Sequence, residues 1–560
     1  MFKNKIIHTV LAAGLVFAAT SCKDQLDVGN PNQPTLAANV NNETGLLTLA
    51  KGGVYVNGFL NGDGWLGNSY FSLPMGYNEL MADNVGASAS NNQVTTIGQP
   101  DYIILDNGEK RINTSPAVGI IHTYNTRAST GANNNAIHYE WLNMYAMNSA
   151  CNLVLSLVDD IEFSGDATTK ANTVKAWCYW WKGYAYAAIG TKYYKGLIVN
   201  EYGVINNDYQ LHDVIVAESD KYFNLAATTL AGVTSTADYE EVLGGLIPSQ
   251  NLTGNGGLLS PAEWIRNINT ALARNLLFNR LAPFVNENPG ASISGTSMVG
   301  TMSNDDWNTI KTLTTNGVQQ GDKIFVGYTT GTNDFFTASG GSVASLASNP
   351  ASTSTFKVSE RVIQSFNTGD NRFTNNFKAE TPYNNDYIYT TRYTVINGGD
   401  GQEGVFIYAD RDPGEYELIM SVTYEENALM LAEANMRLGA PEVGLALIDE
   451  VRDYLGAGVA AVAGSGLTPE KAMTELTKER KVALLFRGLS FYDNRRWGWT
   501  YDISQGGGSY NNVIVLGAVV NTKAIINYNF MDYWDVPANE AVLNPDVDGN
   551  TDIRNANYAN

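Results

Sequence analysis

Apolar residues recur along much of the chain at spacings of three and four residues, which is the period of an amphipathic helix. In residues 139–161, for example, Trp141, Tyr145, Cys151 and Leu155 fall close to one helical face. The same pattern predicts helices over residues 139–161, 169–190, 215–233, 260–280, 423–439 and 440–456, and a further pair within 468–498. Most of the predicted helices therefore follow one another in pairs, joined by short polar turns.

Local signals mark where several of these helices begin and end. Ser260 and Glu263 have the spacing of a capping box, with Pro261 at the first helical position. Gly439 and Gly456 stand where C-caps are expected. Paired helices of this kind are typical of tetratricopeptide-like units, in which each pair buries one face against the next. We therefore predict a mainly α fold.

Long stretches between the helical pairs lack helical periodicity. Residues 53–128 and 284–417 are rich in Gly, Asn and Thr, with aromatic residues among them. Loops of this size inside a compact domain are usually functional, or they contain secondary structure that a single sequence does not show. We predict one domain over residues 36–560, with a helical scaffold at about 129–283 and 418–498 and a large irregular ligand-binding half.

The N-terminus has the layout of a secretory signal. Residues 1–21 begin with Lys3 and Lys5 and continue as an apolar run that is too short to span a bilayer. Cleavage before Cys22 would leave a thiol that can carry a diacylglyceryl chain, and the segment resembles a bacterial lipoprotein signal. The following "KDQLD" resembles the acidic export tag of surface lipoproteins of Bacteroidota, and residues 22–35 fit a flexible tether. The alternative is an ordinary signal peptide with an incidental cysteine.

Charge and cysteine content narrow the class of protein. Without the two lysines of the signal, 33 basic residues face 56 acidic ones, so the mature chain has a formal charge of −23. Nucleic-acid binding needs a basic surface, so we predict no nucleic-acid partner. Cys151 and Cys178 both lie in apolar helical patterns and are predicted as small core residues, with a single disulfide as the open alternative.

Enzyme signatures are not found in the sequence. His122, His138 and His212 show no metal-ligand spacing, and there is no P-loop, dinucleotide-binding glycine pattern or G-x-S-x-G elbow. The chain is therefore predicted not to be an enzyme. A glycosidase carboxylate pair stays open, because such pairs meet only in three dimensions.

The stretch "DVDGNTD" near the C-terminus has alternating oxygen ligands. Asp546, Asp548, Asn550 and Asp552 stand at positions 1, 3, 5 and 7, an arrangement that suits Ca²⁺. The glycine is at position 4 instead of 6, and Asn557 replaces the usual Glu at position 12. A structural Ca²⁺ site and a solvated turn are the two interpretations, and no other cofactor is predicted.

Three segments resemble the SusD/RagB family. "WLNMYAMNSACNLVL" (141–155) resembles its first-helix pattern, and "YWDVPANEAVLNP" (533–545) its closing segment, through Pro537, Glu540, Asn544 and Pro545. "ERKVALLFRGLSFYDNRRWG" (479–498) resembles its most recognisable segment, and the matching residues are Glu479, Arg480, Leu484, Phe486, Gly488, Phe491, Asp493, Arg496, Trp497 and Gly498. The chain departs from the family pattern at Ala483, Arg487 and Ser490.

The resemblance implies a nutrient-binding lipoprotein of the outer membrane, exposed on the cell surface and anchored through lipid on Cys22. It implies a partner too, a SusC-like TonB-dependent transporter on which the protein sits as a lid. The helical half would contact the transporter and the irregular half would bind the ligand. We expect capture of an oligosaccharide without bond cleavage. The alternatives are a RagB-like oligopeptide-binding protein, a surface glycosidase and a scaffold that binds only proteins.

Sugar recognition calls for flat aromatic faces beside neutral hydrogen-bonding groups. Three stretches (61–84, 304–336 and 381–393) offer this mixture. The candidate ligand-binding residues are Trp65, Tyr70, Tyr77, Asn78, Trp307, Tyr328, Asn333, Phe335, Tyr383, Asn384 and Arg392. Each aromatic residue taken singly could instead serve packing. Residues predicted to pack in the core are Trp177, Trp180, Trp181, Phe486, Phe491 and Trp497.

Overall fold

A computed structural model describes residues 40–56, 76–87, 94–114, 121–122, 136–252, 254–279, 302–328, 356–383, 391–395 and 417–555. The α-helices are α3 (Glu43–Lys51), α5 (Gly76–Met81), α6 (Val94–Ile97), α8 (Ala136–Leu157), α9 (Ala167–Lys192), α10 (His212–Leu230), α11 (Thr236–Leu246), α12 (Pro261–Asn279), α14 (Asn304–Thr315), α16 (Glu360–Ile363), α17 (Asn371–Asn376), α18 (Tyr424–Arg437), α19 (Pro441–Tyr454), α20 (Pro469–Ala483), α21 (Ser490–Arg496) and α22 (Ala538–Leu543). Shorter helical turns are η1 (Gly52–Val56), η4 (Val158–Asp160), η5 (Ser249–Asn251) and η8 (Ile503–Gln505).

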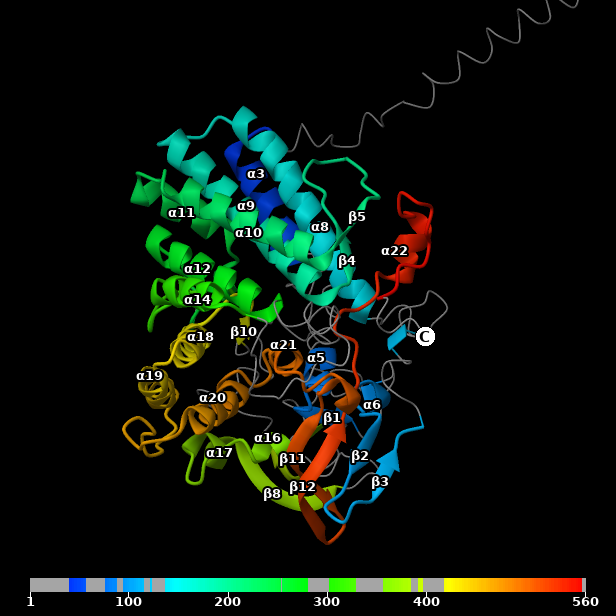
Figure 1. The fold of residues 1–560 in the computed structure, drawn as a ribbon. Helices are drawn as coiled ribbons and strands as arrows, with labels where there is room; N and C mark the ends of the chain where they lie inside the picture. Colours follow the sequence, from blue (N-terminus) through cyan, green and yellow to red (C-terminus); the bar gives the residue numbers. More distant parts are fainter. Residues whose placement is uncertain are drawn as a thin grey trace, which may run out of the picture.

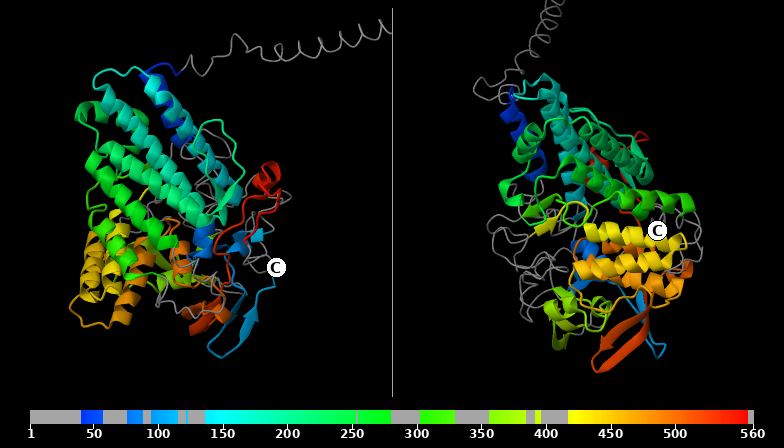
Figure 2. Two further views of the ribbon diagram at one scale, coloured as in Figure 1. Left: turned by 45° about the horizontal axis from the view of Figure 1, so that its top comes forward. Right: turned by 90° about the vertical axis from the view of Figure 1, so that its left-hand side faces the viewer.

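The long helices stack in one continuous row. α8 packs on α9 and α9 on α10, α10 packs on α12, α12 on α14, and α14 on α18, which also contacts α19 and α20 (Figure 1). Two further directions show the same row (Figure 2). The prediction of a mainly helical fold built from stacked helices is confirmed. Within the described ranges, no helix has both the length and the apolar content needed to cross a membrane.

The predicted helix ends are confirmed where the sequence signals are strong. The Ser260 N–H donates to Glu263 Oε2 at 2.7 Å, and the Glu263 N–H donates back to Ser260 Oγ at 3.3 Å. Pro261 is the first residue of α12. Gly439 and Gly456 adopt positive φ angles of 86° and 67° shortly after α18 and α19 end. Glycine suits this left-handed conformation because it has no Cβ.

The predicted pair within residues 468–498 is also confirmed, and a strained turn separates its helices α20 and α21. Phe486 has a φ angle of 59° and Gly488 one of 72°. A residue with a side chain is costly in this conformation unless its surroundings hold it there. Here the Gly488 N–H donates to Glu79 Oε1 at 2.7 Å, so a carboxylate from α5 fixes the turn.

The strands are β1 (Val85–Ala87), β2 (Tyr102–Ile104), β3 (Lys110–Ile112), β4 (Lys195–Leu197), β5 (Tyr209–Leu211), β6 (Val326–Tyr328), β7 (Phe356–Val358), β8 (Phe377–Tyr383), β9 (Thr391–Val395), β10 (Glu417–Ile419), β11 (Ser509–Leu516) and β12 (Val519–Asn527). One antiparallel sheet has the order β11-β12-β2-β3, and Ile525 pairs with Ile104 across it. The other strands form two-stranded pairs: β1 with β7, β10 with β6, β4 with β5, and β8 with β9.

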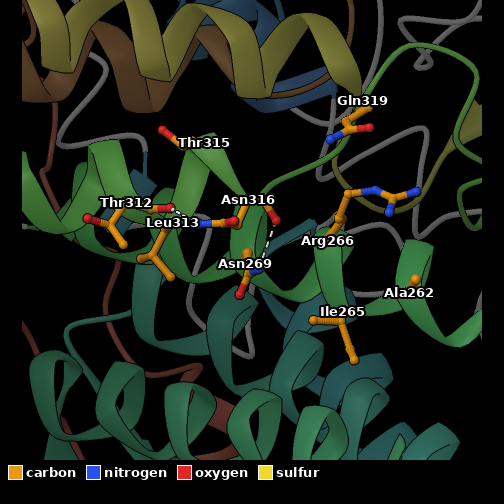
Figure 3. Close-up of a pocket in the computed structure, with 9 residues that line it drawn as sticks. All are labelled: Ala262, Ile265, Arg266, Asn269, Thr312, Leu313, Thr315, Asn316 and Gln319. Atoms are coloured by element: carbon orange, nitrogen blue, oxygen red, sulfur yellow. Dashed lines mark hydrogen bonds between the residues drawn. The ribbon is translucent and has the colours of Figure 1, made fainter. Parts of the chain in front are cut away.

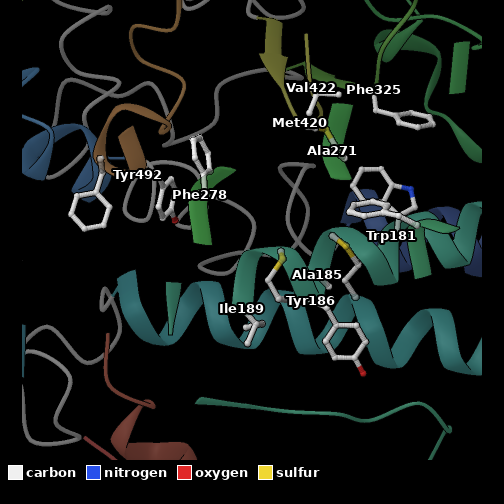
Figure 4. Packing of buried hydrophobic residues seen from close by; sticks show 14 of the residues in the cluster. Trp181, Ala185, Tyr186, Ile189, Ala271, Phe278, Phe325, Met420, Val422 and Tyr492 are labelled. Carbon is white, nitrogen blue, oxygen red and sulfur yellow. The ribbon is translucent and has the colours of Figure 1, made fainter. Parts of the chain in front are cut away.

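Aromatic side chains fill the core between the helices. Trp177, Trp180 and Trp181 of α9 are at most 1% exposed. Their rings surround Phe325, with centroids 5.7, 4.8 and 5.8 Å from its ring, and Trp264 of α12 approaches the same ring at 5.2 Å. Figure 4 shows Trp181 of this cluster on α9, with Phe325, Met420 and Val422 on the segments that cover the helix. The prediction that these three tryptophans are core residues is confirmed.

The other predicted core residues are buried as well. Phe486, Phe491 and Trp497 are 4%, 1% and 3% exposed. Cys151 and Cys178 are buried free thiols on α8 and α9, so the prediction of core residues instead of a disulfide is confirmed. Burial raises the pKa of the Cys178 thiol well above its ordinary value.

Buried ion pairs join α18, α20 and α21. Arg496 donates to both carboxylate oxygens of Glu433 at 2.9 and 2.7 Å, and Arg480 donates to Asp493 at 2.9 Å. Burial alone would raise the pKa of Glu433, but the charge of Arg496 outweighs it and holds that pKa at about 2. Leaving one of these charges unpaired inside the protein would be strongly destabilising.

The three departures from the family pattern are accommodated within this region. Ala483 is buried among the apolar side chains of α18, α19 and α20. Arg487 pairs with Glu425, and Ser490 begins α21.

Candidate ligand-binding groove

Two candidate ligand residues of α5 lie inside the protein. Tyr77 is 1% exposed and its ring centroid lies 6.4 Å from that of Trp534. Asn78 is 5% exposed, and its Nδ2 donates to the Gly488 carbonyl at 3.0 Å. Asn78 therefore holds α5 against the turn between α20 and α21, and Tyr77 packs α5 against Trp534. We correct their assignment from ligand contacts to packing residues.

Trp307 is also buried. It is 4% exposed on the inner side of α14, together with Ile310 and Thr314, and the Arg437 guanidinium lies 5.7 Å from its ring centroid. The spacing of these three residues is that of an amphipathic helix, within a stretch that we had interpreted as irregular. Trp307 is accordingly corrected to a residue that packs α14 against α18.

The hairpin of β8 and β9 brings two other candidates near each other. Tyr383 pairs with Thr391 in the backbone register, one residue before Arg392. The side chain of Arg392 is 34% exposed, and its Nε donates at 3.0 Å to Glu360, whose side chain is fully buried. Arg392 is therefore held at the surface in a fixed orientation. Its role as a ligand contact stays a prediction.

The remaining candidates are placed only in part or not at all. Tyr328 ends β6, and only its backbone is described. Trp65, Tyr70, Asn333, Phe335, Asn384 and the proposed lipidation site Cys22 lie outside the described residues. The division of the chain at residues 21 and 35 lies there too and stays a prediction.

A groove between α12 and α14 is a candidate ligand-binding site on the described surface. It has a volume of about 530 Å³. Figure 3 shows the lining side chains, which are Ala262, Ile265, Arg266, Asn269, Thr312, Leu313, Thr315, Asn316 and Gln319. None of these residues was a candidate from the sequence, although the capping box of α12 had located that helix.

Local contacts fix the start of α14, which forms one wall of the groove. The Asp306 N–H donates to Ser303 Oγ at 3.1 Å, and the Ser303 N–H donates to Asp306 Oδ2 at 3.0 Å. This second capping box sets the first turn of the helix.

The loop that follows α14 is fixed by buried polar groups from two other helices. The Val318 N–H donates to Thr270 Oγ1 at 2.9 Å, and Asn427 Nδ2 donates to the Thr314 carbonyl at 2.9 Å. A Cβ on Gly317 would lie 2.1 Å from Asn427 Oδ1, so only glycine fits there without rearrangement. The rim of the groove is thus tied to α12 and α18.

The polar groups of the groove are arranged without excess charge. Arg266 donates to both oxygens of Asp322, from Nε at 2.7 Å and from Nη2 at 2.5 Å, and these bonds raise the pKa of Arg266. Asn269 Nδ2 donates to the Asn316 carbonyl at 2.8 Å. The exposed side chains of Thr312, Thr315, Asn316 and Gln319 supply further donors and acceptors. Such a surface suits a neutral, hydroxyl-rich ligand lying on the aliphatic side chains beneath.

The predicted calcium ligands already have protein partners. Asp546 Oδ2 lies 3.2 Å from Lys195 Nζ, and Asp548 and Asn550 each accept the N–H two residues on, at 2.8 and 3.0 Å. In the described part of the chain, no group of three or more His, Cys, Asp or Glu side chains is placed to hold a metal ion. Calcium at Asp552 and its neighbours stays a prediction.

Two histidines have contacts that the sequence did not predict. His122 Nδ1 lies 2.5 Å from Asp535 Oδ2, and Asp535 also accepts the Asn555 N–H at 2.7 Å. His212 stacks on Tyr533 with ring centroids 3.9 Å apart, and burial lowers its pKa to about 4. Both contacts pack the C-terminal segment against the rest of the protein.

Comparisons with known proteins agree with the resemblance found in the sequence. Residues 424–553 match the model of the SusD family. A SusD superfamily protein from Bacteroides vulgatus has 15% identity and a TM-score of 0.52, with 90% of this chain and 97% of that chain covered. Surface glycan-binding protein A from Bacteroides fluxus has 14% identity and a TM-score of 0.54, with 92% of this chain and 100% of that chain covered. No curated protein sequence matches the chain.

The two kinds of comparison cover different lengths of the chain. The family model rests on the segment that contains α18 to α22, whereas the structural likeness extends along almost the whole chain and concerns the fold. Residues 424–553 therefore carry the pattern of the SusD family, and the chain as a whole shares its fold with these solved structures.

Proposed function

We propose that this protein captures an oligosaccharide at the cell surface without cleaving it, and delivers it to a SusC-like TonB-dependent transporter of the outer membrane. The observation that carries the proposal is the match of residues 424–553 to the SusD family. A protein that shares the fold is named surface glycan-binding protein A, which supports a glycan as the ligand class.

The groove between α12 and α14 adds a physical argument. Its one cationic side chain, Arg266, is neutralised by Asp322, so an anionic ligand would gain little from it. Amide and hydroxyl groups instead match the many hydroxyls of a neutral sugar. Aromatic stacking would come from the candidate residues of the loops, such as Trp65 and Phe335.

The proposed location follows from the N-terminal sequence. A lipid on Cys22 would hold the protein in the outer membrane, and the polar stretch after it would let the folded part reach a transporter. A Ca²⁺ ion at Asp546 and its neighbours would stabilise the C-terminal turn and would take no part in ligand capture.

Calorimetric titration of the chain without its signal and lipidation site, residues 23–560, against neutral oligosaccharides and short peptides tests the ligand class. Heat with one glycan class supports the proposal. Heat with peptides alone would establish the oligopeptide alternative, and release of reducing ends from a bound glycan would show a glycosidase. Binding of neither ligand class would contradict capture.

A matched pair of variants tests the groove. Thr312→Trp would fill it, whereas Thr309→Trp changes an exposed threonine of the same helix that does not line it. Both hydroxyls donate at 2.8 Å to the carbonyl four residues earlier, so the two substitutions remove the same local bond. We expect Thr312→Trp to weaken glycan binding at least tenfold and Thr309→Trp to leave it unchanged. If Trp65→Ala abolishes binding while both helix variants bind normally, the ligand lies on the loops alone.

A further inference from the structure

Exposed apolar side chains are concentrated on one surface. Eight of the sixteen large apolar residues that are exposed in the described part of the chain lie in two short segments, 199–214 and 538–552. They are Tyr202, Val204, Ile205, Leu211, Val214, Val542, Leu543 and Val547, which we call the apolar patch. Ile205 is 87% exposed and Leu543 is 73% exposed. Single exposed apolar residues are ordinary, but a concentration of them marks an interaction surface.

Hydrogen bonds join the two segments into one surface. Asn207 Nδ2 donates to the Pro545 carbonyl at 3.0 Å, and Asn544 Nδ2 donates to the Asn206 carbonyl at 2.8 Å. The Tyr209 hydroxyl donates to the Asn544 carbonyl at 2.9 Å. The loop between β4 and β5 and helix α22 accordingly lie beside each other in Figures 1 and 2. The two segments are therefore held together as one surface.

The charges around the apolar patch are mostly negative. The two segments contain seven acidic residues and no lysine or arginine; the acidic residues are Glu201, Asp208, Asp213, Glu540, Asp546, Asp548 and Asp552. Lys195 and Arg554, just outside the two segments, pair with Asp546 and Asp552, so the border as a whole has a net negative charge. An anionic membrane surface would repel this border, and so would the same border of a second copy. The complementary surface is apolar with lysine or arginine around it.

We infer that this protein docks on a protein partner through the apolar patch. The matching face of that partner would be apolar and bordered by lysine or arginine. The identity of that partner as the transporter rests on the proposed function. Burying the apolar side chains would supply most of the affinity, and the acidic border would set orientation and the rate of association.

Affinity of the full mature chain for the SusC-like transporter encoded nearest to it, purified in detergent, tests the inference. The patch variant carries Ile205→Asp and Leu543→Asp. The control carries Val519→Asp and Val520→Asp, which are 61% and 44% exposed on the β11–β12 hairpin at the other end of the molecule in Figure 1. Both variants add the same two negative charges at exposed positions, so both should unfold at the wild-type temperature.

We expect the patch variant to bind the transporter at least tenfold more weakly than wild type, and the control to stay within twofold of wild type. Equal binding by the patch variant would overturn the docking surface and leave the proposed function standing. A wild-type chain that binds glycan but not the transporter would overturn delivery itself, and the docking partner with it. Two other results would overturn the inference in favour of a different occupant. One is a concentration-dependent dimer in sedimentation that the patch variant loses, and the other is patch-dependent binding to phosphatidylcholine–phosphatidylglycerol vesicles.

Discussion

Replacing Gly317 with alanine tests whether neighbouring helices fix the rim of the groove. The new Cβ would lie 2.1 Å from Asn427 Oδ1 and 2.4 Å from Thr270 Oγ1. These two atoms already share a hydrogen bond of 2.8 Å, and both residues are buried. Overpacking costs about 1–3 kcal/mol and disturbing the buried bonds about 1–3 kcal/mol more, so we expect a loss of about 2–6 kcal/mol.

Urea unfolding followed by tryptophan fluorescence measures this loss, because many tryptophans lie in the core. Gly244→Ala in α11 is the control. There the nearest atoms to a new Cβ are Leu258 methyl groups at 3.9 Å, which is ordinary contact. Alanine is favoured over glycine within a helix, so this control should gain about 0.5–1 kcal/mol. The two substitutions add the same methyl group and should shift the midpoint in opposite directions.

A double variant separates the steric clash from a general loss of stability. Asn427→Ala removes one of the atoms in the way, so the cost of Gly317→Ala should be smaller in that background than in wild type. Full additivity would refute the clash, and so would a Gly317→Ala midpoint equal to that of Gly244→Ala. Either result would mean that the loop moves freely. The rim of the groove would then not be fixed as the structure indicates.

Three further predictions concern separate parts of the chain. Burial raises the pKa of Glu79 to about 7, so the folded protein keeps a proton that the unfolded chain loses near pH 4.5. The urea concentration at the unfolding midpoint should therefore fall as the pH rises from about 4.5 to about 7. In Glu79→Gln this midpoint should fall less over the same pH range, and an equal fall in the variant and the wild type would contradict the prediction. Thiol titration of urea-unfolded protein without Cys22 should find two free thiols, Cys151 and Cys178, and fewer would indicate a disulfide. Cys22→Ala should release the protein from the membrane fraction, and a variant that stays there is anchored by other means.

Helices could be predicted from the sequence because their signals are local. The capping residues Ser260 and Glu263 stand three positions apart, and the glycine that ends α18 follows directly on the apolar pattern. Such contacts need no knowledge of the rest of the fold. The helix α14 was not predicted, because its apolar residues lie within a long stretch rich in Gly, Asn and Thr.

The sheet and the groove could not be predicted, since distant residues form them. β2 pairs with β12 across more than four hundred residues of sequence. The groove depends on Gly317, Thr270 and Asn427, which belong to three different segments. For the same reason an aromatic residue of a loop could not be assigned as exposed or buried. Trp307 and Tyr77 both pack inside, and only Trp307 had a local signal for this, in its helical spacing to Ile310 and Thr314.

The family signature and the proposed ligand-binding groove occupy different parts of the chain, and this separation has a consequence for specificity. Residues 479–498 serve packing: Phe491 and Trp497 are buried, and Arg480 and Arg496 form buried ion pairs. Substitutions there should change stability and leave ligand choice unaltered. The exposed groups of the proposed groove lie on α12, on α14 and just after it, where proteins of the same fold with 14–15% identity are free to differ. The ligand of this chain must therefore be identified through variants of those surfaces, and the Thr312→Trp and Thr309→Trp pair is the first such comparison.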